Sequence, residues 1–470
     1  AGCLAAEYLL EGILVFAPQG IPRLAAIELN GYSLLFACAS CILIALAFGI
    51  APALLMNRRD LQNSLNLGNA RLTGHPRGAF FRKSLIAAEI TVTAVLLASA
   101  GMVIHNFYNL QRVELGFLPD HALTAQIRLS GYDQPRSKAF FIQLLERLQS
   151  RPEVTAAGAI LLRPFEGTVG WDVAYQTRGQ DSLQASGNPI SNFEVVTPDY
   201  FRAVGTPLLA GRWFTLDDKD SNQNVMIVSR SLARDLFGNF SGAIGKQVAL
   251  GRSQPDENTA WWTVVGVVAD AQYRKLGVTQ RDIFIPFLQT NIPLRYLVVR
   301  TKTSPEAFLP ALRQELAAID SRQAVSKVRT LEQLIAGAKT GPRFAMLLFL
   351  VFGVFAALLS AVGVYGLVSD SIVQRRREAG IRMALGAQPR QVLFLLMQGE
   401  MRAVLLGEFF GLLFSLGLFR IYAPLLYGLE GMDYLSAAAT IVILTSVTLA
   451  ASTFPALRAT ELPLTHLLAD

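Results

Sequence analysis

Long apolar runs separated by charged segments dominate the pattern of this 470-residue chain. A helix that crosses a bilayer needs about 20 mostly apolar residues. Four runs have that length, and a fifth, shorter one carries Glu408 near its middle, where a carboxylate is tolerated only if it faces other helices. We therefore expect five membrane helices, and the apolar opening up to Phe16 resembles the remainder of a sixth. The predicted spans are residues 32–55, 84–104, 344–368, 403–419 and 435–457.

Between the second and third of these runs, residues 106–341 change to a different pattern. Short β-branched and aromatic runs alternate there with segments of helical periodicity, and no low-complexity stretch interrupts them. This pattern predicts a folded α+β domain, with an arrangement in two lobes left open. We expect strands at residues 122–129, 154–161, 225–229, 261–269, 282–287 and 296–301, and helices at residues 135–150 and 305–319.

The basic residues of the short loops predict the orientation of the spans. Lys and Arg are concentrated in residues 56–83 and 370–391, whereas residues 17–31 and 423–434 contain only Arg23 as a strong cation. Cytoplasmic loops carry the excess of Lys and Arg. Residues 56–83 and 370–391 are therefore expected inside the cell, and the α+β domain outside.

Composition narrows the class of protein further. Hydrophobic residues make up 52% of the chain and charged residues only 16%, which excludes an ordinary soluble enzyme. The net charge of +7 comes from cations clustered beside apolar runs, so it indicates membrane topology and lipid contact rather than nucleic acid. Neither a disulfide framework nor a metal site is expected, because the three cysteines (Cys3, Cys38 and Cys41) lack nearby His or acidic ligands and the four histidines are scattered.

A short basic segment, "QRRREAGIRMALGAQPRQV" at residues 374–392, lies between two apolar runs. At helical spacing Ile381, Ala384 and Leu385 share one face and charged residues occupy the others, which predicts an amphipathic helix. Gly386 is placed to end this helix and Pro389 to start the next. From physics alone two roles remain open: an anchor in the lipid headgroups and a docking element for a cytoplasmic partner.

One internal repeat is visible in the chain. Ala-Pro-Ala-Leu at residues 51–54 and Phe-Pro-Ala-Leu at residues 454–457 both end an apolar run. If this match is a true repeat, the chain contains the tail of one unit followed by a complete second unit, and most of the first unit is missing.

The basic segment resembles the cytoplasmic loop of the FtsX/MacB family of ABC transporter permeases. Arg377-Glu378, Gly380-Ile381-Arg382, Ala384, Gly386 and Ala387 match the family signature, and Ala379 departs from its usual Ile. "VGTPLLAGRWFTLDD", "GAIGKQVAL" and "FPALRATELPLTHLLA" also look like parts of this family, although Leu462-Pro463 stands where Asp-Pro is usual. The two-unit organisation is most similar to the duplicated orphan permeases related to MacB.

This resemblance implies a multi-pass permease of the bacterial inner membrane, with FtsX-like α-helical spans and a MacB-like periplasmic α+β domain. Residues 1–55 would end the first repeat, 56–83 would be a cytoplasmic linker, 84–105 the first span of the second repeat, 106–341 the periplasmic domain and 342–470 the FtsX-like domain. The resemblance assigns docking on a separate ATPase to Arg375, Arg376, Arg377, Glu378, Gly380, Ile381, Arg382, Ala384, Leu385, Gly386 and Ala387.

The same resemblance implies that ATP is bound by the partner subunit, so that the chain itself is not an enzyme and has no cofactor. In agreement, "GAIGKQ" at residues 242–247 lacks the first Gly and the final Ser or Thr of a phosphate-binding loop. A second permease unit, either the missing repeat or another copy, and a periplasmic adaptor are the further partners it implies. Two alternatives to export stay open: activation of periplasmic cell-wall hydrolases and Lol-like lipoprotein extraction. The length of the outer domain favours the MacB type.

Overall fold

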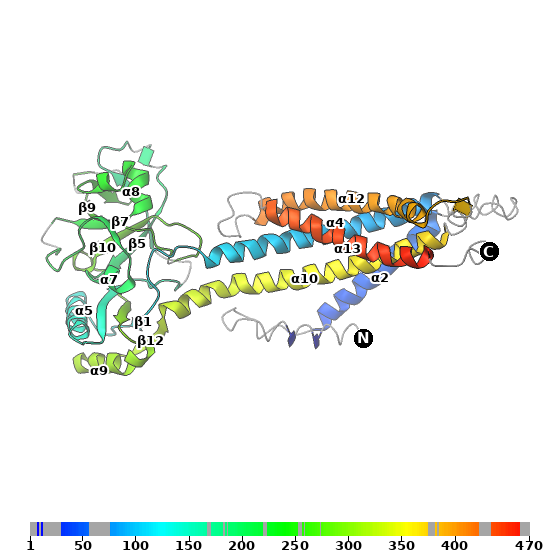
Figure 1. The fold of residues 1–470 in the computed structure, drawn as a ribbon. Helices are drawn as coiled ribbons and strands as arrows, with labels where there is room; N and C mark the ends of the chain where they lie inside the picture. The colour runs from blue at the N-terminus through cyan, green and yellow to red at the C-terminus, as the bar shows by residue number, and fades with distance from the viewer. Residues whose placement is uncertain are drawn as a thin grey trace. The chain divides into compact units, whose positions relative to one another are not determined.

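The computed structural model divides the chain into two compact units. We call them the helical unit (Ala1–Asn109 and Gly341–Asp470) and the sheet unit (Leu110–Thr340). Figure 1 shows the long helices of the first and the mixed sheet and helices of the second. The structure describes residues 7–8, 11–12, 30–55, 76–166, 171–181, 184–185, 187–219, 223–251, 256–257, 259–272, 274–374, 381–382, 385–422 and 434–460.

All five predicted spans are helical. Four segments are long and apolar enough to cross a membrane: Lys83–Gln111, Leu331–Val373, Met401–Leu418 and Tyr434–Thr453. The first predicted span lies within a 25-residue helix, Gly31–Leu55, which contains an apolar segment at Gly31–Leu43. The helices are α2 (Gly31–Leu55), α4 (Pro76–Gln111), α10 (Leu331–Gln374), α12 (Pro389–Tyr422) and α13 (Tyr434–Thr460).

Helix α10 begins earlier than its predicted span. The sequence placed a boundary between residues 341 and 342 and started the span at residue 344, but the helix already begins at Leu331 and contains Pro342 in its interior. A proline usually ends a helix because it lacks an N–H and crowds the preceding turn. Here the helix continues through it, and the division between the two units falls just before it, at Gly341.

Helix α12 packs closely on α4 through two glycines. A Cβ on Gly407 would lie 2.7 Å from the Ala87 carbonyl oxygen, and one on Gly411 would lie 2.4 Å from the Ala94 Cβ. Small residues four apart let membrane helices approach in this way. Between them Glu408 is buried and accepts a hydrogen bond from Thr445 Oγ1 of α13 at 3.2 Å. The predicted condition for a carboxylate in this span, contact with other helices, is therefore met.

In the described part of the sheet unit, strands join into a single 12-stranded sheet of order β12-β1-β11-β2-β5-β10-β7-β9-β8-β4, with β3 beside β5 and β6 beside β9. Its two halves meet through one pair, Ile160 opposite Val196. The strands are β1 (Ala122–Ile127), β2 (Val154–Ile160), β3 (Trp171–Val173), β4 (Tyr175–Thr177), β5 (Ser191–Val196), β6 (Leu208–Gly211), β7 (Val225–Ser229), β8 (Gln247–Leu250), β9 (Trp261–Val268), β10 (Asp282–Pro286), β11 (Tyr296–Thr301) and β12 (Val325–Thr330).

Helices cover both faces of this sheet. One core contains α5, α8 and α9 with the side chains of one sheet face, and a second contains α7 and the first turns of α10 with those of the other. Both predicted helices are confirmed, although the second starts as a 3-10 turn. The helices are α5 (Gln134–Gln149), α7 (Tyr200–Val204), α8 (Arg230–Phe237) and α9 (Leu309–Ile319), with 3-10 turns η2 (Ser241–Ala243), η3 (Phe287–Gln289) and η4 (Glu306–Phe308).

Candidate functional site

The helix in the basic loop between α10 and α12 ends at Gly386, as the sequence predicts. Gly386 has a φ of +93°, a left-handed conformation that glycine adopts without strain. The N–H of Leu385 donates to the carbonyl of Ile381, and the N–H of Ala387 donates to the carbonyl of Arg382, both at 3.0 Å. The second bond spans five residues, which is the pattern of a Schellman C-cap.

The described part of this loop exposes the apolar face that the sequence predicts. Ile381 is 47% exposed and Leu385 is 82% exposed, and α12 starts at Pro389. An exposed apolar pair beside several arginines suits a binding partner better than free solvent. The coupling roles of all the predicted loop residues remain predictions, and Arg375, Arg376, Arg377, Glu378, Gly380 and Ala384 lie outside the described residues.

A second candidate region is the junction where β12 runs directly into α10. Thr330 caps the helix: its Oγ1 accepts from the N–H of Gln333 at 3.1 Å, and Gln333 Oε1 accepts from the N–H of Thr330 at 3.2 Å. These reciprocal bonds form a capping box. Leu331, Leu334 and Ile335 are buried in the sheet's second core. The first turns of α10 are therefore fixed to the sheet.

Strand β12 contains a bulge just before this junction. Its register with β1 pairs Gln126 with Ser326 and Thr124 with Arg329, so two residues of β12 lie opposite one of β1. Lys327, in the bulge, has a φ of +46°, which is unfavourable for a residue with a Cβ. Such a conformation persists only where neighbouring contacts hold it.

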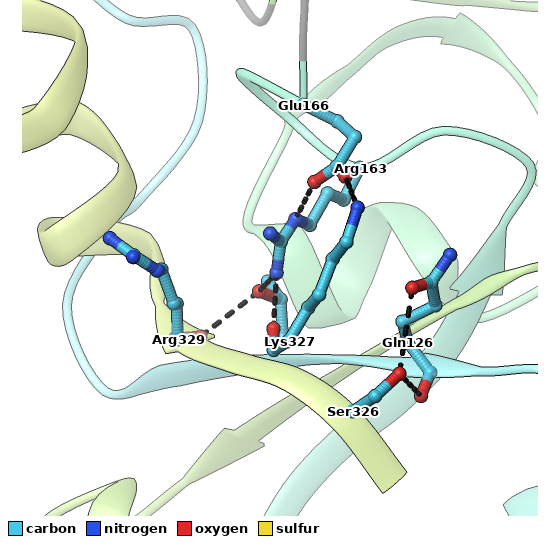
Figure 2. A network of polar contacts seen from close by, with 7 residues as sticks. Gln126, Arg163, Glu166, Ser326, Lys327 and Arg329 are labelled. Carbon is cyan, nitrogen blue, oxygen red and sulfur yellow. Dashed lines mark hydrogen bonds and ion pairs between the residues drawn. The ribbon is translucent and has the colours of Figure 1, made fainter. Parts of the chain in front are cut away.

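A buried arginine supplies those contacts, as Figure 2 shows. The side chain of Arg163 is only 5% exposed. Its Nη1 donates to the carbonyl of Lys327 at 2.5 Å and to Thr124 Oγ1 at 3.3 Å, and its Nε donates to Glu166 Oε2 at 2.6 Å. The Lys327 ammonium donates to Glu166 Oε1 at 2.5 Å. We call Arg163, Glu166 and Lys327 the junction clamp.

Electrostatics keep Glu166 of the junction clamp ionised. Burial by itself raises the pKa of Glu166, but hydrogen bonds from Lys327 and Tyr296 and the charge of Arg163 outweigh it, so its pKa lies below the ordinary value. Burial and the bond to Glu166 raise the pKa of Tyr296 to about 12. At neutral pH the carboxylate is therefore ionised, and Tyr296 remains a hydrogen-bond donor.

Sequence reasoning missed the junction clamp. Its members come from the loop after β2 and from β12, and nothing in the spacing of Arg163 and Lys327 indicates that they meet. The capping box carries a readable signal, because Thr330 precedes Gln333 by three residues ahead of an apolar run. The Gly407 and Gly411 pair also had a signal, the small-residue spacing of packed membrane helices.

A separate carboxylate, Glu194 of β5, is fully buried in the sheet unit. Its Oε2 accepts from the N–H of Leu162 at 3.1 Å, and its Oε1 is buried without a hydrogen-bond partner. Burial raises the pKa of Glu194 well above its usual range, and the charge of Arg274 only partly opposes this. The native sheet unit therefore holds a proton here that the unfolded chain releases at lower pH.

Replacement of Glu194 by Gln is expected to change how stability depends on pH. A raised native pKa means that folding takes up a proton, so wild-type stability falls as pH rises from the ordinary glutamate pKa toward the native one. Glu194→Gln lacks this loss, so its stability relative to wild type should rise as pH increases above the ordinary glutamate pKa. Tryptophan fluorescence melts of the full chain measure it, because all four tryptophans lie at residues 171–262 in the sheet unit.

Glu315→Gln is the matched control. Hydrogen bonds from Arg151 and Arg147 lower the pKa of Glu315. Above the ordinary glutamate pKa its contribution to folding stability is therefore fully present and no longer changes with pH. The difference in folding stability between Glu315→Gln and wild type should therefore stay nearly constant over the same pH range. If the stability difference between Glu194→Gln and wild type does not change with pH, Glu194 is ionised in the native state.

Both units of the chain match models of known protein families. Residues 91–319 match the family model of the MacB-like periplasmic core domain, and residues 350–464 match that of the FtsX-like permease C-terminal. The chain is 23% identical over 266 residues to the macrolide export ATP-binding/permease protein MacB of Hahella chejuensis, covering 54% of this chain and 39% of that protein. For the protein of the same name from Burkholderia lata, identity is 27% over 238 residues, covering 48% and 33%.

Among solved structures, the periplasmic region of MacB from Actinobacillus actinomycetemcomitans aligns with a TM-score of 0.31 and 16% identity, over 47% of this chain and 92% of that one. The extracellular domain of the ABC-type transporter YknZ from Gram-positive bacteria aligns with a TM-score of 0.28 and 18% identity, over 43% and 100%.

The chain thus spans about two-fifths of the length of the first curated relative, at 39%. Its four span-length apolar helices and its two family matches make it a multi-pass protein of the bacterial inner membrane with a periplasmic α+β domain. The sequence resemblance is confirmed: this chain belongs to the FtsX/MacB family of ABC transporter permeases.

Proposed function

We propose that this chain is the permease subunit of a MacB-type exporter driven by a separate cytoplasmic ATPase. The observation that carries the proposal is the match of an FtsX-like permease segment and a MacB-like periplasmic domain in one chain, joined to a basic loop with exposed Ile381 and Leu385. The MacB relatives combine ATP-binding and permease functions in their names. In this chain ATP would be bound by the partner subunit.

The coupling path begins at the basic loop. Ile381 and Leu385, with Ala384 between them on the predicted helix, form an apolar ridge that a groove on the ATPase accepts. The flanking arginines orient the helix and contact acidic groups or lipid headgroups. We favour docking over a role as a lipid anchor alone because the chain matches the FtsX-like permease family, whose members pair with a cytoplasmic ABC ATPase.

The coupling path ends at the start of α10. This helix carries its capping box and its first buried side chains in the sheet unit, and it continues to Gln374 beside the basic loop. A displacement of the loop therefore acts on a helix whose other end is fixed to the sheet by its capping box and its buried first turns. Gly341 and Pro342 lie between the two ends, where the helix is weakest.

The proposal includes two further partners. A second permease unit, supplied by another copy or by a preceding repeat, completes the assembly, and a periplasmic adaptor binds the sheet unit. Export is favoured over hydrolase activation and lipoprotein extraction because the sheet unit matches the MacB-like core domain.

The proposed orientation predicts opposite labelling on the two sides of the membrane. In a variant with Cys3, Cys38 and Cys41 changed to Ala, Arg234→Cys should react with a membrane-impermeant maleimide in spheroplasts. Leu385 is 82% exposed, and a cysteine at this position, Leu385→Cys, should react only after permeabilisation. The reverse pattern would show that the topology is inverted. The basic loop would then lie outside the cell, where a cytoplasmic ATPase could not bind it.

The direct test of the proposed function is recovery of an ATP-binding subunit with the affinity-tagged permease, followed by ATP hydrolysis in proteoliposomes. We expect an ABC-type ATP-binding subunit in stoichiometric amount and faster hydrolysis with the permease than without it. If the permease recovers no such subunit from the membranes of its own cells, the proposal is wrong.

A further inference from the structure

A cavity of about 610 Å³ lies among three membrane helices of the helical unit, α4, α10 and α13. Each helix lines it with residues three or four apart, so each presents one continuous face to the cavity. Neither the basic loop nor the junction clamp contributes to it, and the proposed function does not use it. The three faces include Gly101 and Ile104 of α4, Val354 and Ala357 of α10, and Ala439 and Ile443 of α13.

The cavity runs along α4, which packs closely on both of the other helices. A Cβ on Gly101 of α4 would lie 2.9 Å from the Ser436 Cβ of α13. A Cβ on Gly353 of α10 would lie 3.3 Å from Leu97 Cδ2 of α4. Small residues allow membrane helices to approach in this way. All four of these residues line the cavity, so α10 and α13 form walls that are fixed against α4.

The dimensions of the cavity decide which occupant it can take. Its lining extends over residues 97–108 of α4 and 350–361 of α10, a length of roughly 17 Å at a rise of about 1.5 Å per residue. The volume of 610 Å³ then gives a mean cross-section of about 40 Å². A helix about 10 Å wide has a cross-section of roughly 80 Å², so a helix of a second copy is too wide. A hydrocarbon chain, whose carbons contact their neighbours at about 4 Å, fits along this length.

Polar groups of the lining gather toward one end of the cavity. His105 and Tyr108 lie where α4 approaches the periplasmic sheet unit, and Ser436 lies in the first turn of α13. Thr440 is one turn further in, but its hydroxyl donates to the Ser436 carbonyl at 2.8 Å and is satisfied within its own helix. Tyr108 is 50% exposed, and tyrosine is enriched at the level of the lipid headgroups. The cavity therefore suits an amphiphile with its polar end toward the periplasm.

We propose that this cavity binds one phospholipid of the periplasmic leaflet. Its hydrocarbon chain lies along α4 between α10 and α13, and its headgroup lies beside His105 and Tyr108. Because the surrounding bilayer is also apolar, the preference for this position comes from packing against three helices instead of from removal of water. Any effect of the lipid on the movement of α10 rests on the proposed function, whereas the binding itself does not.

Native mass spectrometry of the full chain, released from detergent and titrated with palmitoyl-oleoyl phosphatidylethanolamine, tests the site. We expect saturable binding of one lipid per chain, ahead of any further lipid. Ala439→Phe on the α13 wall and Ala357→Phe on the α10 wall should each weaken this binding about tenfold or more, because the ring takes the place of the hydrocarbon chain. Variants on two different walls keep the test valid if one ring turns away from the cavity.

Ala438→Phe is the matched control. Ala438 is the neighbour of Ala439 on α13 and is also exposed, but it does not line the cavity, so this variant should bind the lipid as wild type does. Circular dichroism confirms that each variant keeps its helices. Absence of saturable binding by the wild type, or equal weakening in Ala438→Phe, would overturn the proposal. If both lining variants leave lipid binding unchanged and instead dissociate a dimer, a second copy occupies the cavity and the proposal is wrong.

Discussion

Ala384→Trp is expected to reduce recovery of the ATP-binding subunit about tenfold, because overpacking a fitted apolar contact costs roughly 1 to 3 kcal/mol. Insertion of the permease into the membrane should be unaffected, and ATP hydrolysis should no longer be stimulated. A helix that only anchors the loop in lipid predicts the opposite, since indole rings favour the membrane interface. Co-purification and hydrolysis in proteoliposomes measure both properties.

Met383→Trp is the matched control for this prediction. On the predicted helix Met383 lies on the side opposite Ile381 and Leu385, so the same bulky residue there should leave the docking face intact. If the two variants recover the ATP-binding subunit equally well, the apolar ridge is not a docking surface and the lipid anchor is the better interpretation.

Arg163→Met should destabilise the sheet unit by about 3 kcal/mol, since it removes one partner of a buried ion pair and leaves Glu166 paired only with the more exposed Lys327. The Lys327 carbonyl and Glu166 lose their bonds to the guanidinium at the same time. For a domain of this size the midpoint of the tryptophan fluorescence melt should fall by about 6 to 12 °C.

Arg202→Met provides the comparison. Arg202 also pairs with an acid three residues away, Asp199 at 3.5 Å, but its side chain is 66% exposed. Exposed pairs contribute ~0 to 1 kcal/mol, so this variant should melt close to wild type. Equal melting points for the Arg163 and Arg202 variants would show that the junction clamp does not hold the bulge of β12.

The membrane spans could be predicted from sequence because length and hydropathy determine them directly. The exception was the start of α10, since residues 331–343 contain Gly337, Gly341 and Pro342, which locally disfavour a helix. Burial of Leu331 and Leu334 against the sheet outweighs those local preferences. Tertiary packing of this kind is not visible in a single sequence.

In the sheet unit the six predicted strands, β1, β2, β7, β9, β10 and β11, are all present because each is a continuous apolar or alternating run. The missed strands carry weaker patterns. Strand β12 reads Val-Ser-Lys-Val-Arg-Thr, and its bulge breaks the alternation. Strand β5 contains Glu194, a residue that rarely occurs buried, and β3 and β4 have three residues each.

For the candidate sites, the sequence located the basic loop but not the junction. The loop has a local signature, and its end at Gly386 follows from the φ that glycine allows. The junction clamp joins Arg163 to Lys327 across the sheet, and such long-range pairs leave no periodic pattern.

The central claim is that ATP hydrolysis by the partner subunit docked on the basic loop changes the conformation of the periplasmic sheet unit relative to the spans. Electron paramagnetic resonance distances between spin labels at Arg313→Cys in α9 and Leu435→Cys in α13 measure this most directly, in proteoliposomes that contain the ATP-binding subunit. The account predicts that ATP shifts the distance distribution in the wild-type background and that Ala384→Trp abolishes the shift. An unchanged distribution while ATP is hydrolysed would contradict it.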